Sequence, residues 1–146
     1  MRSPVATTTE VPVGESFLID SNVLLDILGA GPWAAWSQDV VAACLRAGPV
    51  HINPVVYAEI SMTFANPIEL DALVPPSVFR RLSIPYPAAF LAAKAHQAYR
   101  RRGGSRAATL PDFFIGAHAL VDGLTVVTRD PRRYRDAFPQ VRVVAP

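Results

Sequence analysis

Three aspartates are placed where a sheet of parallel strands would bring them to one edge. Asp20 follows the apolar stretch "FLI", and Asp130 comes two residues after the apolar stretch "VVT". Short apolar runs of this kind are typical of buried strands, so both carboxylates are expected at strand ends. Asp112 opens the helix that leads into "VVT", and a right-handed crossover would return that helix start to the same edge.

A fourth acid, Glu59, lies on a predicted helix whose nearby residues are mostly apolar. At helical spacing its neighbours are Val55, Val56, Met62 and Thr63. A lone glutamate on such a face is costly unless it is paired, hydrogen-bonded or bound to a cation. Glu59 therefore has no simple structural explanation.

Carboxylates that gather at one place repel each other, so a site of this kind needs a cation. Hard oxygen ligands favour Mg²⁺ or Mn²⁺ over zinc, and Mg²⁺ commonly binds substrate phosphate as well. Such ions activate water and stabilise the leaving oxygen of a phosphodiester. The four acids together favour metal-dependent phosphodiester chemistry.

Each aspartate also has a purely structural alternative. Asp20 could cap the first helix, and Asp112 fits a capping box with Thr109. Asp130, followed by Pro131, could simply begin a turn. Convergence of all the acids on one predicted edge favours the shared site over these separate roles.

The remaining elements alternate along the chain, which predicts a three-layer α/β/α fold with a mostly parallel central sheet of four to five strands. In such sheets ligands bind beyond the carboxyl ends of the strands. Asn53 and Pro54 read as helix cap and first helical residue. The predicted strands are residues 16–20, 49–52, about 81–84, 124–128 and 141–144. The predicted helices are 22–30, 32–48, 54–64, short helices within 66–87, then 87–103, 109–123 and part of 130–138.

Length and composition predict one folded domain, residues 16–146, after a flexible N-terminal tail, residues 1–15. The 146 residues are 51% apolar, which excludes an intrinsically disordered chain. No apolar run approaches the roughly 18 residues of a membrane span, and the N-terminus lacks the apolar block of a secretory signal. Cys44 is the only cysteine, so no intrachain disulfide can form; a cytoplasmic protein with a packed core thiol is expected.

Positive charge is concentrated in clusters of arginine. The net charge of +2 is too small to identify a nucleic-acid partner, but every basic residue except Lys94 is an arginine. A genome rich in G and C would explain the excess of arginine, although not its clustering. Guanidinium groups bind phosphate in a planar, bidentate way. The candidates for such contacts are Arg100, Arg101, Arg102, Arg106, Arg129 and Arg132.

Four segments carry a resemblance to a known family. "FLIDSNVLLDIL", "NPVVYAEI", "LPDFFIGAHAL" and "VVTRDPRRYRDAFPQVRVV" resemble, in order and spacing, the signatures of PIN-domain ribonucleases, and most of all the VapC-type toxins of bacterial toxin–antitoxin pairs. The resemblance spans residues 17 to 144. It implies a single PIN-like nuclease domain. Its acidic metal site falls on Asp20, Glu59, Asp112 and Asp130, with Asn22 and Thr128 as polar support.

The resemblance also implies an activity and partners. It implies a Mg²⁺- or Mn²⁺-dependent endoribonuclease that hydrolyses RNA phosphodiesters with metal-activated water. Such proteins are usually cytoplasmic homodimers inhibited by a small cognate antitoxin. This chain departs from the pattern in its longer N-terminal tail and its proline-rich middle, which leaves the substrate-facing helices and the RNA target open.

Two other functions remain as alternatives. A haloacid-dehalogenase-like phosphatase also has an aspartate after its first strand, but it needs a second acid two positions on, where this chain has Asn22. It also needs a later lysine, and Lys94 lies in the middle of a helix. The second alternative is a PIN-like module that binds RNA or protein without catalysis.

Asp26 and the three histidines are the other polar residues of interest in the sequence. Asp26 shares a helix face with Asn22 and could lie at the rim of the site or on a solvated polar stripe. The three histidines, His51, His96 and His118, show no zinc-like spacing, so packing or surface roles are expected for them.

Overall fold

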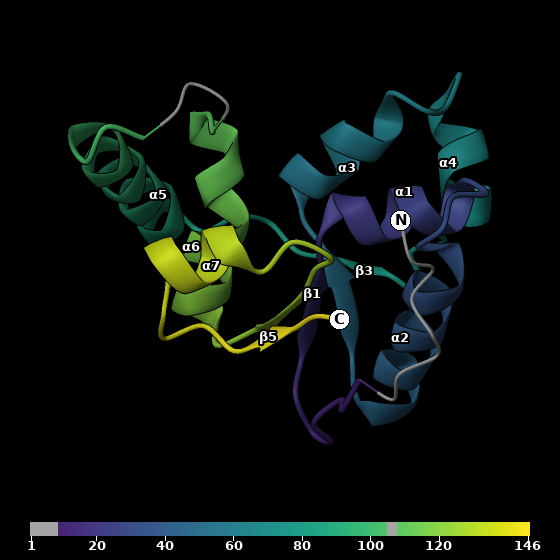
Figure 1. Cartoon of the computed structure of the whole chain (residues 1–146). Helices are drawn as coiled ribbons and strands as arrows, with labels where there is room; N and C mark the ends of the chain where they lie inside the picture. Colours follow the sequence, from purple (N-terminus) through teal and green to yellow (C-terminus); the bar gives the residue numbers. More distant parts are fainter. Residues whose placement is uncertain (1–8, 105–107) are drawn as a thin grey trace.

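A parallel sheet of five strands forms the centre of the protein (Figure 1). The computed structural model describes residues 9–104 and 108–146. Within them the strand order is β3-β2-β1-β4-β5, and all four neighbouring pairs are parallel. The predicted three-layer α/β/α fold is confirmed. The strands are β1 (Phe17–Ile19), β2 (Val50–Ile52), β3 (Arg80–Arg81), β4 (Thr125–Val127) and β5 (Val143–Val144).

Helices lie on both sides of the sheet. In Figure 1, α2 and α4 lie to the right of the strands and α5 to α7 to the left. The elements are α1 (Ser21–Leu28), α2 (Ala34–Ala47), α3 (Pro54–Ser61), α4 (Pro67–Leu73), α5 (Tyr86–Arg101), the 3-10 helix η1 (Leu110–Phe113), α6 (Phe114–Asp122) and α7 (Arg132–Ala137).

One predicted helix differs from the structure in a way that matters for the site. The sequence predicts a continuous helix over residues 109–123, whereas the chain forms the tight turn η1 before α6. The N–H of Asp112 bonds the carbonyl of Thr109 at 3.0 Å, three residues back, as in a 3-10 helix. The Asp112 side chain also folds back onto Thr109, which holds this tight first turn.

The register between β1 and β4 fixes where the site begins. Phe17, Leu18 and Ile19 are fully buried, so β1 has no freedom to shift. Ile19 pairs with Val127, and the N–H of Asp20 bonds the carbonyl of Val127 at 2.9 Å. The residues that follow these two strands therefore emerge next to each other at the carboxyl edge of the sheet.

A buried polar link joins α3 to α6. Oδ1 of Asn53 accepts the N–H of Val56 at 3.0 Å, which confirms the predicted cap of α3. Its Nδ2 must then donate to Nδ1 of His118, 3.2 Å away, so neutral His118 carries its proton on Nε2. Nε2 donates to Asp122 at 2.8 Å. The link holds the helix that carries Glu59 against the helix that follows Asp112.

The described part of the N-terminal segment contacts the domain. The Trp36 indole donates to the hydroxyl of Thr9 at 2.9 Å, and the N–H of Gly14 bonds the carbonyl of Ala47 at 3.0 Å. Residues 1–8 of the predicted tail lie outside the described residues.

The cysteine of this chain lies in the core. Cys44 is fully buried, and burial raises the pKa of its thiol to about 12, as expected for a thiol in the core. Across residues 9–104 and 108–146, no helix combines the length and the apolar character that crossing a membrane requires.

The free energy of unfolding should fall as the pH drops below about 6.5, the ordinary pKa of histidine. Burial lowers the pKa of His118 in the folded protein, despite the opposing effect of Asp122, so the unfolded chain binds more protons in acid. One such group contributes at most about 1.4 kcal/mol per pH unit. Protonated His118 would also carry a proton on the nitrogen that faces the Asn53 amide.

Urea denaturation between pH 7.5 and 5.0 measures this dependence. His118→Gln should flatten the pH dependence, while His96→Gln, a change at a partly exposed histidine, should keep it. An unchanged dependence in His118→Gln would contradict the neutral, buried state of His118.

Candidate active site

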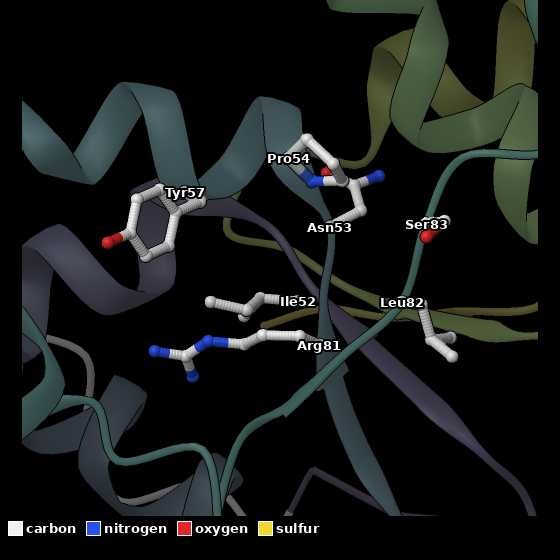
Figure 2. A pocket seen from close by; sticks show the side chains of 7 residues that line it. All are labelled: Ile52, Asn53, Pro54, Tyr57, Arg81, Leu82 and Ser83. Carbon is white, nitrogen blue, oxygen red and sulfur yellow. The ribbon is translucent and has the colours of Figure 1, made fainter.

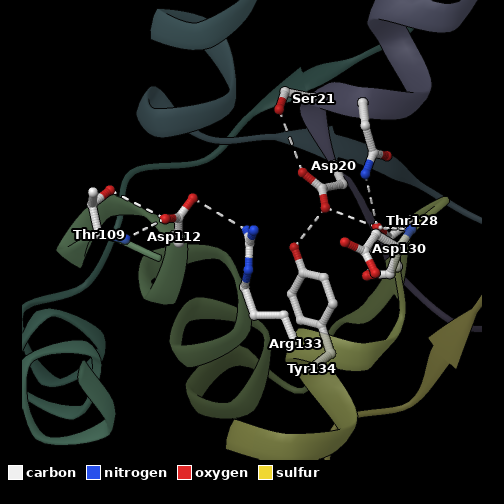
Figure 3. A network of polar contacts seen from close by, with 9 residues as sticks. Asp20, Ser21, Thr109, Asp112, Thr128, Asp130, Arg133 and Tyr134 are labelled. Atoms are coloured by element: carbon white, nitrogen blue, oxygen red, sulfur yellow. Dashed lines mark hydrogen bonds and ion pairs between the residues drawn. The ribbon is translucent and has the colours of Figure 1, made fainter. Parts of the chain in front are cut away.

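Asp20 lies between the end of β1 and the start of α1, and its carboxylate is held by residues from far along the chain. Its Oδ2 accepts hydrogen bonds from the Thr128 hydroxyl at 2.9 Å and the Tyr134 hydroxyl at 2.8 Å (Figure 3). Oδ1 has only a longer contact, 3.5 Å, with the Ser21 hydroxyl. The side chain makes no cap bond to α1, so the capping alternative for Asp20 does not hold. Oδ1 is therefore the oxygen with capacity for another partner.

Thr128 connects Asp20 to two other predicted site residues. Its buried hydroxyl donates to Asp20 and accepts from Asn22 Nδ2 at 3.2 Å and from the N–H of Asp130 at 3.1 Å. Oδ1 of Asn22 accepts the N–H of Arg129 at 3.1 Å. These bonds attach the loop after β4 to the start of α1.

Tyr134 is a site residue that sequence reasoning missed. It comes from α7, is 1% exposed, and donates its hydroxyl proton to Asp20. Burial and the negative charge of Asp20 raise the pKa of Tyr134 well above its ordinary value, so the phenol remains a donor. In the sequence Tyr134 stands among arginines, and no local pattern relates it to a carboxylate 114 positions earlier.

Glu59 lies within the field of two other site carboxylates. Burial raises the pKa of Glu59 first, and the charges of Asp20 and Asp112 raise it further. A hydrogen bond with Ser21 and the positive charge of Arg133 act in the opposite direction. Asp20, Glu59 and Asp112, taken together, are called the carboxylate cluster below.

The two oxygens of Asp112 have different partners. Oδ2 accepts hydrogen bonds from the backbone N–H and the hydroxyl of Thr109, which confirms the predicted capping box. Oδ1 forms an ion pair with Nη1 of Arg133 at 3.2 Å. The capping role of Asp112 therefore uses one oxygen and leaves the other to face the site.

Asp130 belongs to the wall of a neighbouring cleft. Its N–H bonds Thr128, and Figure 3 shows it beside that residue. The cleft has a volume of about 950 Å³ and extends along α7. Three arginines, two aspartates and two aromatic rings are among its lining residues: Arg132, Arg133, Arg135, Asp130, Asp136, Tyr99 and Phe113.

The other predicted phosphate-binding arginines have varied surroundings. Arg100 and Arg101 are exposed at the end of α5, and Arg102 pairs with Asp136 at 3.2 Å. Arg129 is held by Asp26 at 2.8 Å and lies over the ring of Trp33. Arg106 lies outside the described residues. Among the candidates that the structure describes, Arg132 is the one that lines the cleft.

Asp26 is a partly buried structural residue rather than part of a solvated stripe. Its Oδ2 accepts from the Ser37 hydroxyl at 2.9 Å as well as from Nε of Arg129. These bonds join α1 to α2 and to the loop after β4. Asp26 therefore supports the loop that carries Thr128 and Asp130.

A second hollow, of about 250 Å³, lies between the ends of β2 and β3 and the start of α3 (Figure 2). Its most polar lining residue, Arg81, already bonds Asp71 and the carbonyls of Phe79 and Val74. The guanidinium also lies over the Tyr57 ring. No carboxylate lines this hollow, so it is separate from the carboxylate cluster.

The carboxylate cluster suits a hard divalent cation in its chemistry, although the side chains are not arranged around one. Within the described parts of the chain, no three His, Cys, Asp or Glu side chains are grouped closely enough to hold a metal ion. The cluster nevertheless consists of carboxylates, which Mg²⁺ and Mn²⁺ prefer. The positive charge beside it now comes from Arg133.

Comparisons with known proteins agree with the fold and define the family. Residues 17–139 match the PIN domain family, so this chain is a member of that family. The predicted resemblance to PIN-domain proteins is confirmed. Among curated protein sequences, none matches the chain.

Solved structures with the same fold include toxin–antitoxin complexes. VapBC2 from Rickettsia felis, bound to a promoter DNA fragment, has a TM-score of 0.70 at 12% identity and covers 90% of this chain and 98% of that one. FitAcB from Neisseria gonorrhoeae has a TM-score of 0.63 at 24% identity, covering 88% and 96%. VapBC-1 from nontypeable Haemophilus influenzae has a TM-score of 0.68 at 12% identity, covering 89% and 97%.

Glu59→Gln should raise the melting temperature of the metal-free protein at pH 7.5 by about 2–4 °C. The pKa of Glu59 is raised in the folded state, so its ionised form destabilises the fold, and this penalty disappears as the pH falls. The amide keeps the shape of the side chain and removes the repulsion.

Thermal unfolding with and without acid measures the effect. Glu10→Gln removes the same charge from an exposed position and should change little. A lower melting temperature for Glu59→Gln at pH 7.5 would contradict the repulsion within the carboxylate cluster.

Tyr134→Phe should lower the free energy of unfolding by about 1.5–3 kcal/mol, the range for a hydrogen bond to a charged group. The change removes only the hydroxyl that bonds Asp20 and leaves the buried ring in place. Urea denaturation measures the loss. Tyr86→Phe, at a residue that is 92% exposed, is the matched control and should be neutral. A Tyr134→Phe protein as stable as wild type would show that this bond does not hold Asp20.

Proposed function

We propose that this chain is a Mg²⁺- or Mn²⁺-dependent endoribonuclease that acts as the toxin of a toxin–antitoxin pair. The observation that carries the proposal is the carboxylate cluster at the carboxyl end of β1. There the protein fixes one oxygen of Asp20, and Glu59 lies within the electrostatic reach of both Asp20 and Asp112. A cleft lined by arginines lies beside this cluster, which suits a substrate chain of phosphates.

The side chains divide the work of phosphodiester hydrolysis between them. Asp20, Glu59 and Asp112 would hold the cation, with Asp130 as a further acid at the cleft. When bound, a divalent cation neutralises the phosphodiester and activates water for in-line attack. Glu59 would serve as a further ligand of the cation or would orient the attacking water, since it lies within the electrostatic reach of Asp20 and Asp112. The expected products carry a 5′-phosphate and a 3′-hydroxyl.

The arginines of the cleft would position the RNA. Arg132 and Arg135 are exposed on α7 and line the cleft next to Asp130. Their guanidinium groups would contact phosphates on either side of the cleaved bond and orient the strand without reading its sequence.

We further infer the partners from the similar solved structures. Those structures include VapBC complexes, so a small cognate antitoxin is the proposed inhibitor of this chain, and the proposed setting is the cytoplasm. The proposed active form is a homodimer. Light scattering of the purified chain would distinguish a dimer from a monomer, and a monomer at assay concentration would contradict this point.

A binding module without catalysis is the second candidate. It is favoured by the ion pair between Asp112 and Arg133, which satisfies the carboxylate without any metal. A haloacid-dehalogenase-like phosphatase has less support. Such an enzyme needs an acid at position 22, where this chain has Asn22. The Asn22 amide instead bonds Thr128 and the backbone of Arg129.

Purified protein should cleave single-stranded RNA in the presence of Mn²⁺ and not in the presence of EDTA. Asp20→Asn should reduce the rate by at least about 100-fold, because it removes a charged ligand while keeping the shape of the side chain. Gel analysis of end-labelled RNA measures both effects.

Asp39→Asn is the control, because Asp39 is exposed on α2, outside the site. Cleavage that persists in EDTA or in Asp20→Asn would contradict the proposed mechanism. A protein that binds RNA with unchanged affinity but cleaves none under any of these conditions would support the binding module instead.

A further inference from the structure

We propose that Arg133 is the resident cation of the carboxylate cluster and that a divalent ion must displace its guanidinium from Asp112 in order to bind. The inference rests on the proposed function, since it concerns the metal that the proposed reaction needs. It assigns Arg133 a role distinct from that of Arg132 and Arg135, the other arginines of α7 that line the cleft.

The two carboxylate oxygens of Asp112 have different partners. Oδ2 is occupied by two hydrogen bonds from Thr109 that hold the start of η1. Oδ1 is the oxygen with capacity for a cation, and Nη1 of Arg133 lies 3.2 Å from it. An ion that binds through Asp112 therefore competes with Arg133 for the same atom.

The Arg133 side chain lies in the middle of the polar network around the carboxylate cluster. In Figure 3 the side chain of Arg133 extends from α7 between Asp112 and Tyr134, whose hydroxyl bonds Asp20. The guanidinium therefore lies between two acids of the cluster: Asp112, which it contacts, and Asp20, which the Tyr134 hydroxyl holds.

The guanidinium of Arg133 adjoins an open cleft into which it can move away from Asp112. The side chain of Arg133 is 36% exposed and forms part of the wall of the 950 Å³ cleft. Displacement needs only rotation of a long side chain, since the backbone of α7 is held separately by the buried ring of Tyr134. By contrast, Arg129 is tied to Asp26 and Trp33, away from the carboxylate cluster.

The exchange has a measurable consequence. Metal-free protein is protected from repulsion among its carboxylates, and the affinity for a divalent ion is lowered by the free energy of the ion pair that is broken. A partly buried pair worth about 1 kcal/mol corresponds to about fivefold in the dissociation constant.

Calorimetric titration of Mn²⁺ into the metal-stripped 146-residue chain tests the proposal. Arg133→Gln should bind Mn²⁺ about fivefold more tightly than Arg135→Gln, which removes the same charge from an exposed position on the same cleft. Arg133→Lys, which keeps the charge, should stay close to wild type and provides a second variant if Arg133→Gln folds poorly.

A metal-free measurement isolates the ion pair. Arg133→Gln should lower the melting temperature of the wild-type chain more than that of Asp112→Asn, because the partner charge is already absent in the second background.

The outcomes separate this proposal from the proposed function. Equal Mn²⁺ affinities of Arg133→Gln and Arg135→Gln, or weaker binding by Arg133→Gln, overturn the displacement of Arg133. If the wild type still cleaves RNA only with Mn²⁺, the proposed function stands without it. If neither wild type nor Arg133→Gln binds Mn²⁺, both proposals fall.

Discussion

Repulsion among the carboxylates at the edge of β1 is the constraint on which the rest of the structure depends. Like charges that lie near one another at a protein surface repel, and the net free energy that stabilises a small domain is only ~5–15 kcal/mol. The charges of Asp20 and Asp112 are close enough to raise the pKa of Glu59. The fold must therefore place hydrogen-bond donors and positive charge next to the carboxylate oxygens of Asp20, Glu59 and Asp112.

The donors come from parts of the chain that are distant in sequence. Thr128 follows the strand that pairs with β1, and Tyr134 comes from the helix beyond it, so both reach the same oxygen of Asp20. Thr109 satisfies one oxygen of Asp112, and Arg133 pairs with the other. One oxygen each of Asp20 and Asp112 is thus held by two hydrogen bonds, whereas Oδ1 of Asp20 has only a long contact with Ser21 and Oδ1 of Asp112 is paired with Arg133.

Local patterns in the sequence predicted the scaffold well. Apolar runs such as "FLI" and "TVV" become buried strands, and Asn53 with Pro54 begins α3, because these signals act over a few residues. The position of Asp20 at the carboxyl end of β1 followed from topology, since a polar residue after a buried parallel strand lies at that edge of the sheet. The helix after Thr109 was predicted as continuous, because the cap that tightens it into η1 depends on a side-chain conformation.

The polar partners of the site could not be predicted in the same way. Tyr134 bonds a carboxylate that is 114 residues away, and nothing in its neighbourhood distinguishes it from a core aromatic residue. Arg129 and Arg133 looked alike in a row of arginines, yet one is held by Asp26 and the other by Asp112. Which acid an arginine selects depends on the direction of its side chain in the folded protein.

In the proposed mechanism, the carboxylate cluster is a cation site at which a divalent ion displaces the guanidinium of Arg133 from Asp112. The sharpest test is anomalous diffraction from crystals of the 146-residue chain grown with Mn²⁺. We expect an anomalous peak in contact with Oδ1 of Asp20 and Oδ1 of Asp112, with the guanidinium of Arg133 moved into the cleft. A map without a peak there, with Arg133 still paired to Asp112, would contradict it.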